Sequence, residues 1–459
     1  MGTAGADAAS VSDSHNPLDP AALRRWASAI KGPVILPGDV AYEDGRRVWN
    51  LAVDRRPAAI VRCGGPDDIL RTVELVRQHG LPLAIRSGGH SQAGHGVVEG
   101  GLVADLGSLR AIEVAPDQRR VRVAAGARGR DVLAATEAHS LVTPMGGCPD
   151  VGVGGLTLGG GENFLMARFG AVCDNVLAAQ VVTADGQLLT ANDDEHADLF
   201  WALRGGGGNF GVVVSFDYRL HDVGELLSGQ FLFPVSRAAE TMKRYRDLMA
   251  NPPDELETSG GLTPDNPAFF LALTISGERT AAERLAAKWR DALQPAEENV
   301  KWSTYSAGMV VPAAASTGSG MFLAEMSDAV VAVLAAAMTS APPAATVVWN
   351  DFHGAVTRVP RDAMAFPLRR PGYDVFLNAP WTDGESRAAA LAWTAEVGSA
   401  LRPFGSGVYV NNLTDDEADR VPEAYGPNYA RLAEIKQKYD PENLFRRNHN
   451  IAPDGARPD

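Results

Sequence analysis

The sequence predicts an α+β fold in two domains, and three observations indicate it. Over the first 220 residues, short apolar strands alternate with amphipathic helices, and hairpin turns join several of the strands. Near Leu220 the glycine clusters stop, and helices then alternate with apolar strands, as in an antiparallel sheet with helices on one face. Near Gly405 the glycine-rich, aromatic composition of the first region returns. We therefore expect the chain to leave its first domain, form the second, and come back to the first.

A β-α-β unit opens the first domain, after a short helix from Asp19 to near Ile30. The strand 58–62 is followed by a helix that begins at Pro66, where a proline and two acids favour a helix start, and ends at Gly80. The strand 82–85 then runs directly into a glycine turn.

The later elements follow from the same patterns, and the turn Asp185-Gly186 is the strongest hairpin signal among them. The expected elements are strands 102–106 and 120–123, helix 131–140, strands 177–183 and 187–190, helix 195–204, strand 212–216, helices 237–249 and 281–293, strand 269–274, and a final helix 423–439.

Composition limits the possible classes of function. With 459 residues, 45% hydrophobic and 21% charged, the chain can build large cores, which excludes general disorder. Its 42 basic and 56 acidic residues give a net charge of −14, the wrong sign for a nucleic-acid binder or for docking on an anionic membrane. The three cysteines are too few for a disulfide framework, and the nine histidines are scattered, so we expect no metal.

No targeting segment is evident. Residues 1–17 are small and polar, without the regions of a signal peptide, and we expect residues 1–16 to be a flexible lead. The longest uncharged stretch, 329–349, is interrupted by Pro342 and Pro343, which predicts a helix, a turn and a strand instead of a membrane span. These patterns predict a soluble, cytoplasmic protein.

One glycine motif has the spacing of a Rossmann dinucleotide-binding site but the wrong flanking elements. Residues 206–211 match G-x-G-x-x-G, but a predicted helix precedes them and a strand follows. The dinucleotide fingerprint needs the opposite order, so that pyrophosphate meets a helix N-terminus. No P-loop motif is present either.

Two other glycine turns carry more information. The turn 86–91 offers consecutive backbone N–H groups suited to pyrophosphate, although a tight turn with a surface histidine is an equal alternative. The turn 146–155, which continues to three glycines at 159–161, suits a backbone laid against a planar ligand. Its Cys148 has an inert alternative, since a lone buried cysteine usually acts as a small hydrophobe.

Taken together, these motifs resemble the FAD-linked oxidases of the vanillyl-alcohol oxidase (PCMH-type) superfamily, and most closely its berberine bridge enzyme-like branch, which includes glucooligosaccharide oxidase and aclacinomycin oxidoreductase. The resemblance spans residues 40–453, and the motifs that carry it are Arg86-Ser87-Gly88-Gly89-His90, the segment 146–155, Arg168-Phe169-Gly170, Asp174-Asn175, 183–186, 198–211, Tyr409-Val410-Asn411, Tyr425-Gly426, 438–441 and 445–451.

The resemblance implies a split FAD-binding domain, residues 17–221 and 406–459, and a substrate domain, residues 222–405, whose antiparallel sheet covers the flavin. It implies FAD bound covalently, through the 8α position to His90 and through C6 to Cys148. We read His95 as a loop residue. The implied cofactor-binding residues are Arg86, Ser87, Gly88, Gly89, His90, Ser91, Cys148, Gly152, Gly154, Gly155, Asn209, Gly211 and Asn450.

The resemblance also assigns catalytic positions. Tyr409 occupies the place of the catalytic base, and because an ordinary tyrosine is a weak base at neutral pH, its site must stabilise the phenolate. Asn411 would hold the flavin or orient Tyr409, and Val151 would face the flavin where O₂ reacts. Tyr373 is a possible second tyrosine, with core packing an equal alternative. The acids Asp150 and Glu162 depart from the pattern and could alter substrate orientation.

The implied reaction oxidises an alcohol, a hemiacetal or a related C–H/X–H group by hydride transfer to flavin N5, with O₂ reduced to H₂O₂. The small-molecule substrate would be a sugar or a bulky natural product of secondary metabolism. Three alternatives remain open: an amine oxidase of the 6-hydroxynicotine oxidase type, a flavin dehydrogenase with an acceptor other than oxygen, and a flavoprotein that only binds a metabolite. The sequence leaves the oligomeric state open.

Overall fold

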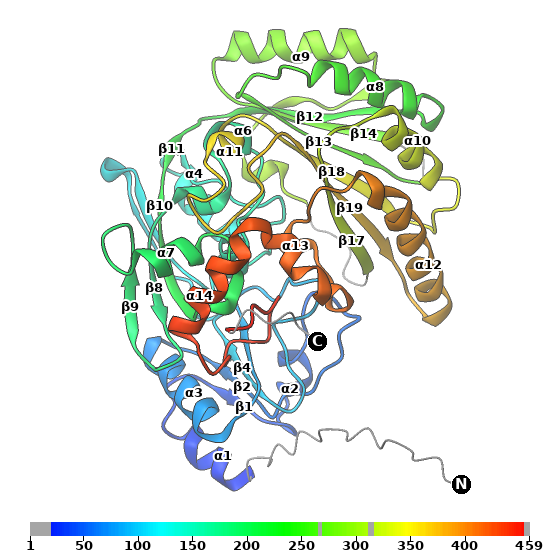
Figure 1. Ribbon diagram of the computed structural model, residues 1–459. Coiled ribbons are helices and arrows are strands. Elements are labelled where there is room, and N and C mark those ends of the chain that lie inside the picture. The colour runs from blue at the N-terminus through cyan, green and yellow to red at the C-terminus, as the bar shows by residue number, and fades with distance from the viewer. Residues whose placement is uncertain (1–19, 265–268, 311–315, 454–459) are drawn as a thin grey trace, which may run out of the picture.

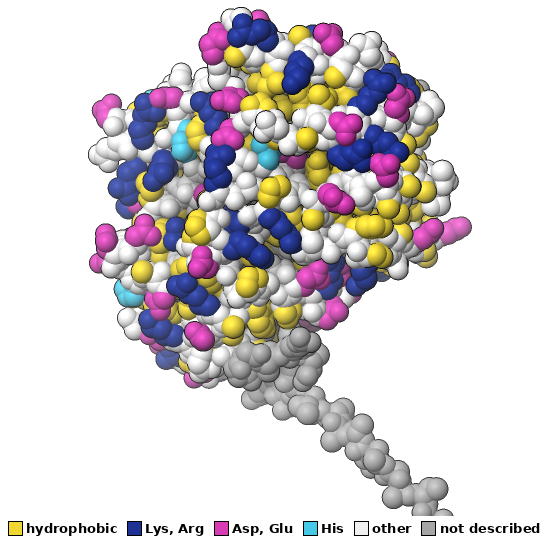
Figure 2. Space-filling view, turned by 45° about the horizontal axis from the view of Figure 1, so that its top comes forward, with side chains coloured by type: hydrophobic (Ala, Val, Ile, Leu, Met, Phe, Trp, Pro, Cys, Tyr) yellow, Lys and Arg dark blue, Asp and Glu magenta, His cyan; other side chains and the backbone are white. Residues whose placement is uncertain are grey.

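The computed structural model describes residues 20–264, 269–310 and 316–453, so the expected flexible lead, 1–16, lies outside the described residues. It confirms the two-domain α+β fold. In Figure 1 the first lobe holds the N-terminal half of the chain and the C-terminal helices, and the second lobe holds β12 to β19 with their helices. Figure 2 shows basic and acidic side chains interspersed over one face of the molecule.

A four-stranded sheet with the order β1-β2-β4-β3 opens the first lobe. Its strands β2, β4 and β3 are parallel, and β1 pairs antiparallel with β2. The connecting helix α3 begins at Pro66 and is capped by Gly80 in the left-handed conformation, at φ 62°, as the sequence predicts. The elements are α1 (Pro20–Ala27), β1 (Val34–Ile35), α2 (Tyr42–Gly45), β2 (Ala59–Arg62), α3 (Pro66–His79), β3 (Leu83–Arg86) and β4 (Leu102–Asp105).

An antiparallel five-stranded sheet with the order β5-β6-β10-β8-β9 completes the first lobe. The predicted hairpin at Asp185-Gly186 joins β8 and β9. The elements of this part are β5 (Ile112–Ala115), β6 (Arg120–Ala124), α4 (Gly129–Glu137), β7 (Leu141–Val142), α5 (Val153–Leu158), α6 (Met166–Phe169), β8 (Val176–Val182), β9 (Leu188–Ala191), α7 (Ala197–Leu203), β10 (Val212–Arg219) and β11 (His221–Asp222).

The second lobe is one antiparallel sheet with the order β15-β12-β14-β13-β18-β19-β17, and β16 also pairs with β12. Four helices, α8, α9, α10 and α12, cover its outer face (Figure 1). Its elements are β12 (Leu226–Phe233), α8 (Ala238–Leu248), β13 (Leu256–Leu262), β14 (Phe269–Ile275), α9 (Arg279–Leu293), β15 (Glu297–Glu298), β16 (Lys301–Ser303), β17 (Ser316–Leu323), α10 (Asp328–Ala337), β18 (Thr346–Phe352), β19 (Gly372–Pro380) and α12 (Gly384–Leu401). The short helix α11 (Ala355–Arg358), between β18 and β19, packs on α6 of the first lobe.

The uncharged stretch 329–349 forms α10, a turn and β18, as its two prolines predict. Within the described ranges, no helix has the length and apolar character needed to cross a membrane.

The chain returns to the first lobe after α12. The single helix expected over 423–439 is wrong, because the structure has two helices, α13 (Val421–Tyr425) and α14 (Tyr429–Tyr439). Gly426, at φ 51°, and Pro427 separate them, since proline lacks the N–H that a continuous helix needs. Residues 364–368 pack into the same core as these helices, so the loop before β19 also belongs to the first lobe.

Candidate active site

The two glycine turns singled out in the sequence pack directly against each other. A Cβ built on Gly88 would lie 2.8 Å from the Cα of Gly152 and closer still to its nitrogen. Ser87 ties the turns together: its hydroxyl donates to the carbonyl of Ala125 at 2.5 Å and accepts from the N–H of Gly154 at 3.3 Å. Only glycine permits this approach of two backbones.

Arg86, at the end of β3, is turned into the protein. Its guanidinium donates to the Asp105 carboxylate on the neighbouring strand β4 at 2.9 Å, and both side chains are largely buried. The pair therefore fixes the strand end from which the glycine turn 87–91 leaves.

His90 and Cys148 share one electrostatic environment. The His90 ring stacks on Trp49, with centroids 5.5 Å apart and an interplanar angle of 16°. Burial lowers the pKa of His90, and the charges of Asp150 and Arg128 act on both His90 and Cys148. Trp49 was not foreseen, since it stands outside any sequence motif.

The Cys148 thiol is the accessible one of the three. Cys63 and Cys173 are buried, and burial raises the pKa of each well above its ordinary value. Burial raises the pKa of Cys148 too, but the backbone N–H groups of Asp150 and Val151 act to lower it and favour the thiolate. The turn thus offers a partly exposed thiol close to two backbone donors.

Asp150 fastens the cysteine turn to helix α4. Its carboxylate accepts from Arg128 at 2.8 Å and also pairs with Arg130. The backbone of the same turn is bonded to α4, since the N–H of Gly129 donates to the carbonyl of Val151 at 3.0 Å. The charge of Asp150 is therefore engaged in ion pairs at this edge of the site.

The glycines 159–161 pack against side chains of the protein itself. A Cβ on Gly159 would collide with the Asn411 amide, and one on Gly160, at φ 112°, with the Phe366 ring. A Cβ on Gly161 would likewise collide with the Val172 side chain. By contrast, a Cβ on Gly155 in α5 would meet open space, so this side of the turn remains available to a ligand.

Asn209 fastens the C-terminal segment to the turn 206–211. The Asn209 amide donates to the carbonyls of Gly206 and His449 at 3.0 and 3.2 Å, and its oxygen accepts from the Ile451 N–H. Gly211, at φ 151°, packs on β8. Asn209 therefore acts by positioning residues 448–451.

Tyr409 and Asn411 lie together, as expected. The Tyr409 hydroxyl oxygen accepts from the Asn411 amide at 2.8 Å and from the Gly161 N–H at 3.0 Å. Burial and the nearby charge of Glu162 nevertheless raise the pKa of Tyr409 well above its ordinary value, against the effect of these two donors. Tyr409 is consequently a neutral phenol at pH 7, where the sequence argument requires a stabilised phenolate.

Tyr373 lies apart from Tyr409. Consecutive residues of β19 point to opposite faces of the sheet, so Tyr373 packs under the helices against Tyr245, with ring centroids 6.1 Å apart. Its neighbour Asp374 points to the other face, where it accepts from the Asn412 amide at 2.6 Å. Asp374 is thus a site residue that we did not predict, although it stands beside one that we did.

Glu162 belongs to the site. The Asn350 amide donates to its carboxylate at 2.8 Å, and Asp374 is close enough to act on the pKa of Glu162. Burial raises the pKa of Glu162 to about 7 and that of Asp374 well above its ordinary range.

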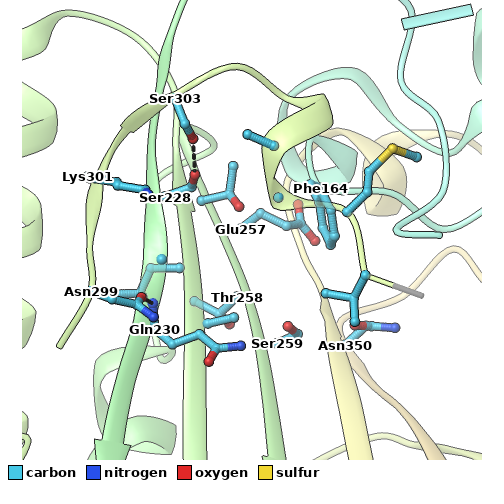
Figure 3. A pocket seen from close by; sticks show the side chains of 18 residues that line it. Phe164, Ser228, Gln230, Glu257, Thr258, Ser259, Asn299, Lys301, Ser303 and Asn350 are labelled. Atoms are coloured by element: carbon cyan, nitrogen blue, oxygen red, sulfur yellow. Dashed lines mark hydrogen bonds between the residues drawn. The ribbon is translucent and has the colours of Figure 1, made fainter. Parts of the chain in front are cut away.

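A polar cavity of about 380 Å³ extends from Asn350 along the inner face of the second-lobe sheet (Figure 3). Glu257 points into it, and Phe164 closes one side. The remaining polar lining comes from β12 to β16: Ser228, Gln230, Thr258, Ser259, Asn299, Lys301 and Ser303. Such a lining suits a ligand with several hydrogen-bonding groups.

The residues around His90 fit a large cofactor such as FAD. Several described residues have buried polar side-chain atoms with no hydrogen-bond partner among the described residues, and these include Trp49, Gln92, Arg447, Asn448 and Asn450. Trp49 and Gln92 lie beside His90, and the segment 447–450 meets the loop that follows His90 further along, since the rings of His95 and His449 are 4.6 Å apart. Buried polar atoms normally have partners, so an unfilled set around one space indicates a polar ligand.

Comparisons with known proteins agree with this geometry. A family model described as FAD binding domain matches residues 57–192, and one described as berberine and berberine like matches residues 408–452. Over 456 aligned residues the chain is 31% identical to (R)-6-hydroxynicotine oxidase of Paenarthrobacter nicotinovorans, covering 93% of this chain and 98% of that protein.

Two solved structures show the same fold. The 6-hydroxy-D-nicotine oxidase of Arthrobacter nicotinovorans superposes with a TM-score of 0.83 at 27% identity, covering 92% of this chain and 98% of that one. The xylooligosaccharide oxidase of Myceliophthora thermophila has a TM-score of 0.83 at 23% identity, covering 94% and 99%.

Proposed function

The chain belongs to the berberine bridge enzyme-like family of FAD-linked oxidoreductases, and from this premise we propose that it is an oxidase with FAD bound covalently to His90 and Cys148. The observation that carries this proposal is the interlocked pair of glycine turns, one bearing His90 and the other Cys148, with both side chains under the influence of Asp150 and Arg128.

The residues around His90 offer the groups that FAD requires. His90 and Cys148 would anchor its ring, the backbone N–H groups of the turn 87–91 would bind its pyrophosphate, and Asn448 and Asn450 offer unpaired polar atoms to it. When bound, FAD supplies the acceptor for a hydride and passes electrons on to O₂, which gives H₂O₂.

A side chain of the protein would take the proton from the substrate hydroxyl. In its phenolate form, which the Gly161 N–H and the Asn411 amide favour, Tyr409 would take the hydroxyl proton of an alcohol or hemiacetal as hydride leaves the carbon. The polar cavity beyond Asn350 would hold the rest of a sugar or a bulky hydroxylated natural product.

An amine substrate is the second candidate, and the buried carboxyls favour it. Glu162, Glu257 and Asp374 lie at or beside the cavity, and carboxylates can pair with a protonated amine. The 31% identical relative is named as an oxidase of 6-hydroxynicotine.

Intact-mass analysis of acid-precipitated protein tests the covalent linkage. We expect a mass increase of one FAD, retained by each of the single variants His90→Ala and Cys148→Ala and lost in the double variant. Flavin that washes out of the denatured wild type contradicts the linkage. A peroxide-coupled screen of alcohols, sugars and amines then identifies the substrate class.

A further inference from the structure

A segment of the second lobe contacts the turn that carries Cys148. We call this segment, residues 304–310 directly after β16, the interlobe strap. Its Tyr305 is buried among first-lobe residues, and its residues 307–310 form part of the wall of the polar cavity (Figure 3). The strap therefore touches both the cysteine turn and the cavity.

Tyr305 closes the glycine-rich segment 146–163 at both of its ends. Its hydroxyl donates to the carbonyl of Met145, the residue before this segment, and accepts from the N–H of Phe164, the residue after it, at 3.1 Å. Burial raises the pKa of Tyr305, so the phenol stays neutral and keeps the hydrogen that it donates. One hydroxyl thus holds together two backbone positions that lie on either side of Cys148.

Two further contacts hold Gly147, the residue directly before Cys148. The N–H of Val310 in the strap donates to the Gly147 carbonyl at 2.8 Å. The Phe164 ring, whose centroid is 5.6 Å from that of Tyr305, packs so closely on Gly147 that a Cβ there would lie 2.8 Å from it. Because the two residues before Cys148 are glycines, with no side chains to fix the turn, these contacts limit where the cysteine can lie.

Helix α4 is bonded to both the strap and the cysteine turn. The Glu137 carboxylate, at one end of α4, accepts from the N–H of Ser306 at 2.8 Å and from its hydroxyl at 2.7 Å. At the other end, Gly129 donates to the Val151 carbonyl of the turn, and a Cβ on Gly129 would lie 3.3 Å from Met309 of the strap. The strap, the helix and the turn are therefore one connected unit.

The turn that carries His90 is held by the first lobe. The Trp49 N–H donates to the Gly89 carbonyl at 2.9 Å, and the Ser87 hydroxyl donates to the Ala125 carbonyl. These partners all belong to the first lobe, so the two attachment residues differ in what must be folded before they are in place.

We propose that Tyr305 and the interlobe strap position Cys148 for its bond to the flavin, so that the linkage at Cys148 requires the docked second lobe whereas the linkage at His90 does not. This inference rests on the proposed function. In the step, the Cys148 thiol loses its proton, its sulfur bonds to C6 of the flavin, and the hydrogen on C6 leaves as a proton. The electron pair of the broken C6–H bond passes into the flavin ring, from which O₂ accepts it to give H₂O₂.

Tyr305 acts through Cys148 and need not touch the flavin. The sulfur must lie within bonding reach of one ring atom, and a displacement of about 1 Å can slow a positioned reaction by about 10²-fold. Without the Tyr305 hydroxyl, the two ends of the segment 146–163 can separate, and the sulfur loses its fixed place.

Tryptic digestion of the denatured holoenzyme, followed by mass spectrometry, tests the proposal, because His90 and Cys148 lie in different peptides, 87–110 and 131–168. In the wild type we expect one FAD to join these two peptides. In Tyr305→Phe the FAD should remain on peptide 87–110, and the fraction also joined to peptide 131–168 should fall by about 10-fold or more. Tyr245→Phe, which removes another buried hydroxyl under the helices of the second lobe, is the matched control and should keep the wild-type fraction.

The visible absorption spectrum gives a second readout, because the sulfur on C6 is conjugated with the flavin ring. Tyr305→Phe should show the spectrum of Cys148→Ala, and adding Tyr305→Phe to Cys148→Ala should change it no further. A wild-type fraction of joined peptides in Tyr305→Phe overturns the proposal. Equal loss of FAD from both peptides would show a general structural role and also overturn it.

Hydrogen exchange separates this inference from the proposed function. In the proteins as purified, amide exchange within the segment 146–163 should be faster in Tyr305→Phe than in the wild type, and unchanged in Tyr245→Phe. If the wild type carries no flavin on Cys148, the proposed linkage fails, while the exchange still decides whether Tyr305 holds the turn. If the wild type shows joined peptides and Tyr305→Phe matches it in exchange and linkage, the inference about the strap fails alone.

Discussion

The backbones of Gly88 and Gly152 are in contact, although the two residues belong to turns that are far apart in the sequence. This contact places the His90 turn and the Cys148 turn side by side, and the hydroxyl of Ser87 in the first turn reinforces it by accepting from the Gly154 N–H in the second. The proposed site for the flavin ring is therefore formed by two segments that must be glycine at their crossing point.

A methyl group at this crossing should damage both folding and flavin attachment. Gly88→Ala would force the two backbones apart, and overpacking of this kind costs about 1–3 kcal/mol. We expect a lower midpoint of thermal unfolding and a reduced fraction of covalently flavinylated protein. Gly384→Ala, at the start of α12 where a Cβ meets open space, is the matched control and should keep both. Normal flavin content in Gly88→Ala would show that the turns can separate without consequence.

Removal of the Tyr409 hydroxyl should slow flavin reduction by an alcohol by a factor of about 10²–10⁴, the range for loss of a positioned acid–base group. Flavin content should stay unchanged. Tyr373→Phe is the control, because its ring packs under the helices on the opposite face of β19, and we expect it to reduce at the wild-type rate. An unimpaired Tyr409→Phe would exclude the phenol as proton acceptor, and would favour an amine substrate, which needs no strong base.

Val151→Leu should slow reoxidation of the reduced enzyme by O₂. The Val151 backbone is held to α4, since its carbonyl accepts from the Gly129 N–H at 3.0 Å, so a longer side chain at this position cannot move aside with the turn. Stopped-flow mixing with oxygenated buffer measures the effect, and reduction by substrate should remain nearly intact. Slow reoxidation already in the wild type would identify a dehydrogenase and contradict the oxidase proposal.

His221 should make the protein less stable at acid pH. Its ring stacks on Phe169 at 4.0 Å, its Nε2–H donates to Asn175 Oδ1 at 2.6 Å, and burial lowers its pKa to about 4. Because the unfolded ring binds a proton near pH 6.5, the stabilisation is present above that pH and is lost as pH falls towards 4.

Denaturant unfolding at a series of pH values checks this. Between about pH 6.5 and pH 4 the wild type should lose on the order of 1 kcal/mol more than His221→Gln, a value reduced for partial solvent screening of the ring. Parallel stability curves for the two proteins would contradict the assignment.

The sequence by itself determined the elements whose limits depend on local chemistry. The proline and acids at Pro66 and the glycine at Gly80 fix both ends of α3, and Asp185-Gly186 fixes a hairpin, because these residues restrict or permit φ directly. Gly426 and Pro427 also restrict or permit φ directly, and they end one helix before the next begins. We expected one continuous helix there, and the structure has two helices.

Only the tertiary structure decided which side chains of the site meet. Alternation along β19 places Tyr373 and Asp374 on opposite faces, but the packing of the helices determines which face is core and which face is cavity. Likewise, nothing local to Glu162 predicts that its carboxyl lies against Asp374, since their contact requires the second-lobe sheet to be folded over the glycine turn of the first. Local chemistry defines elements, whereas contacts between distant segments depend on how complete elements pack.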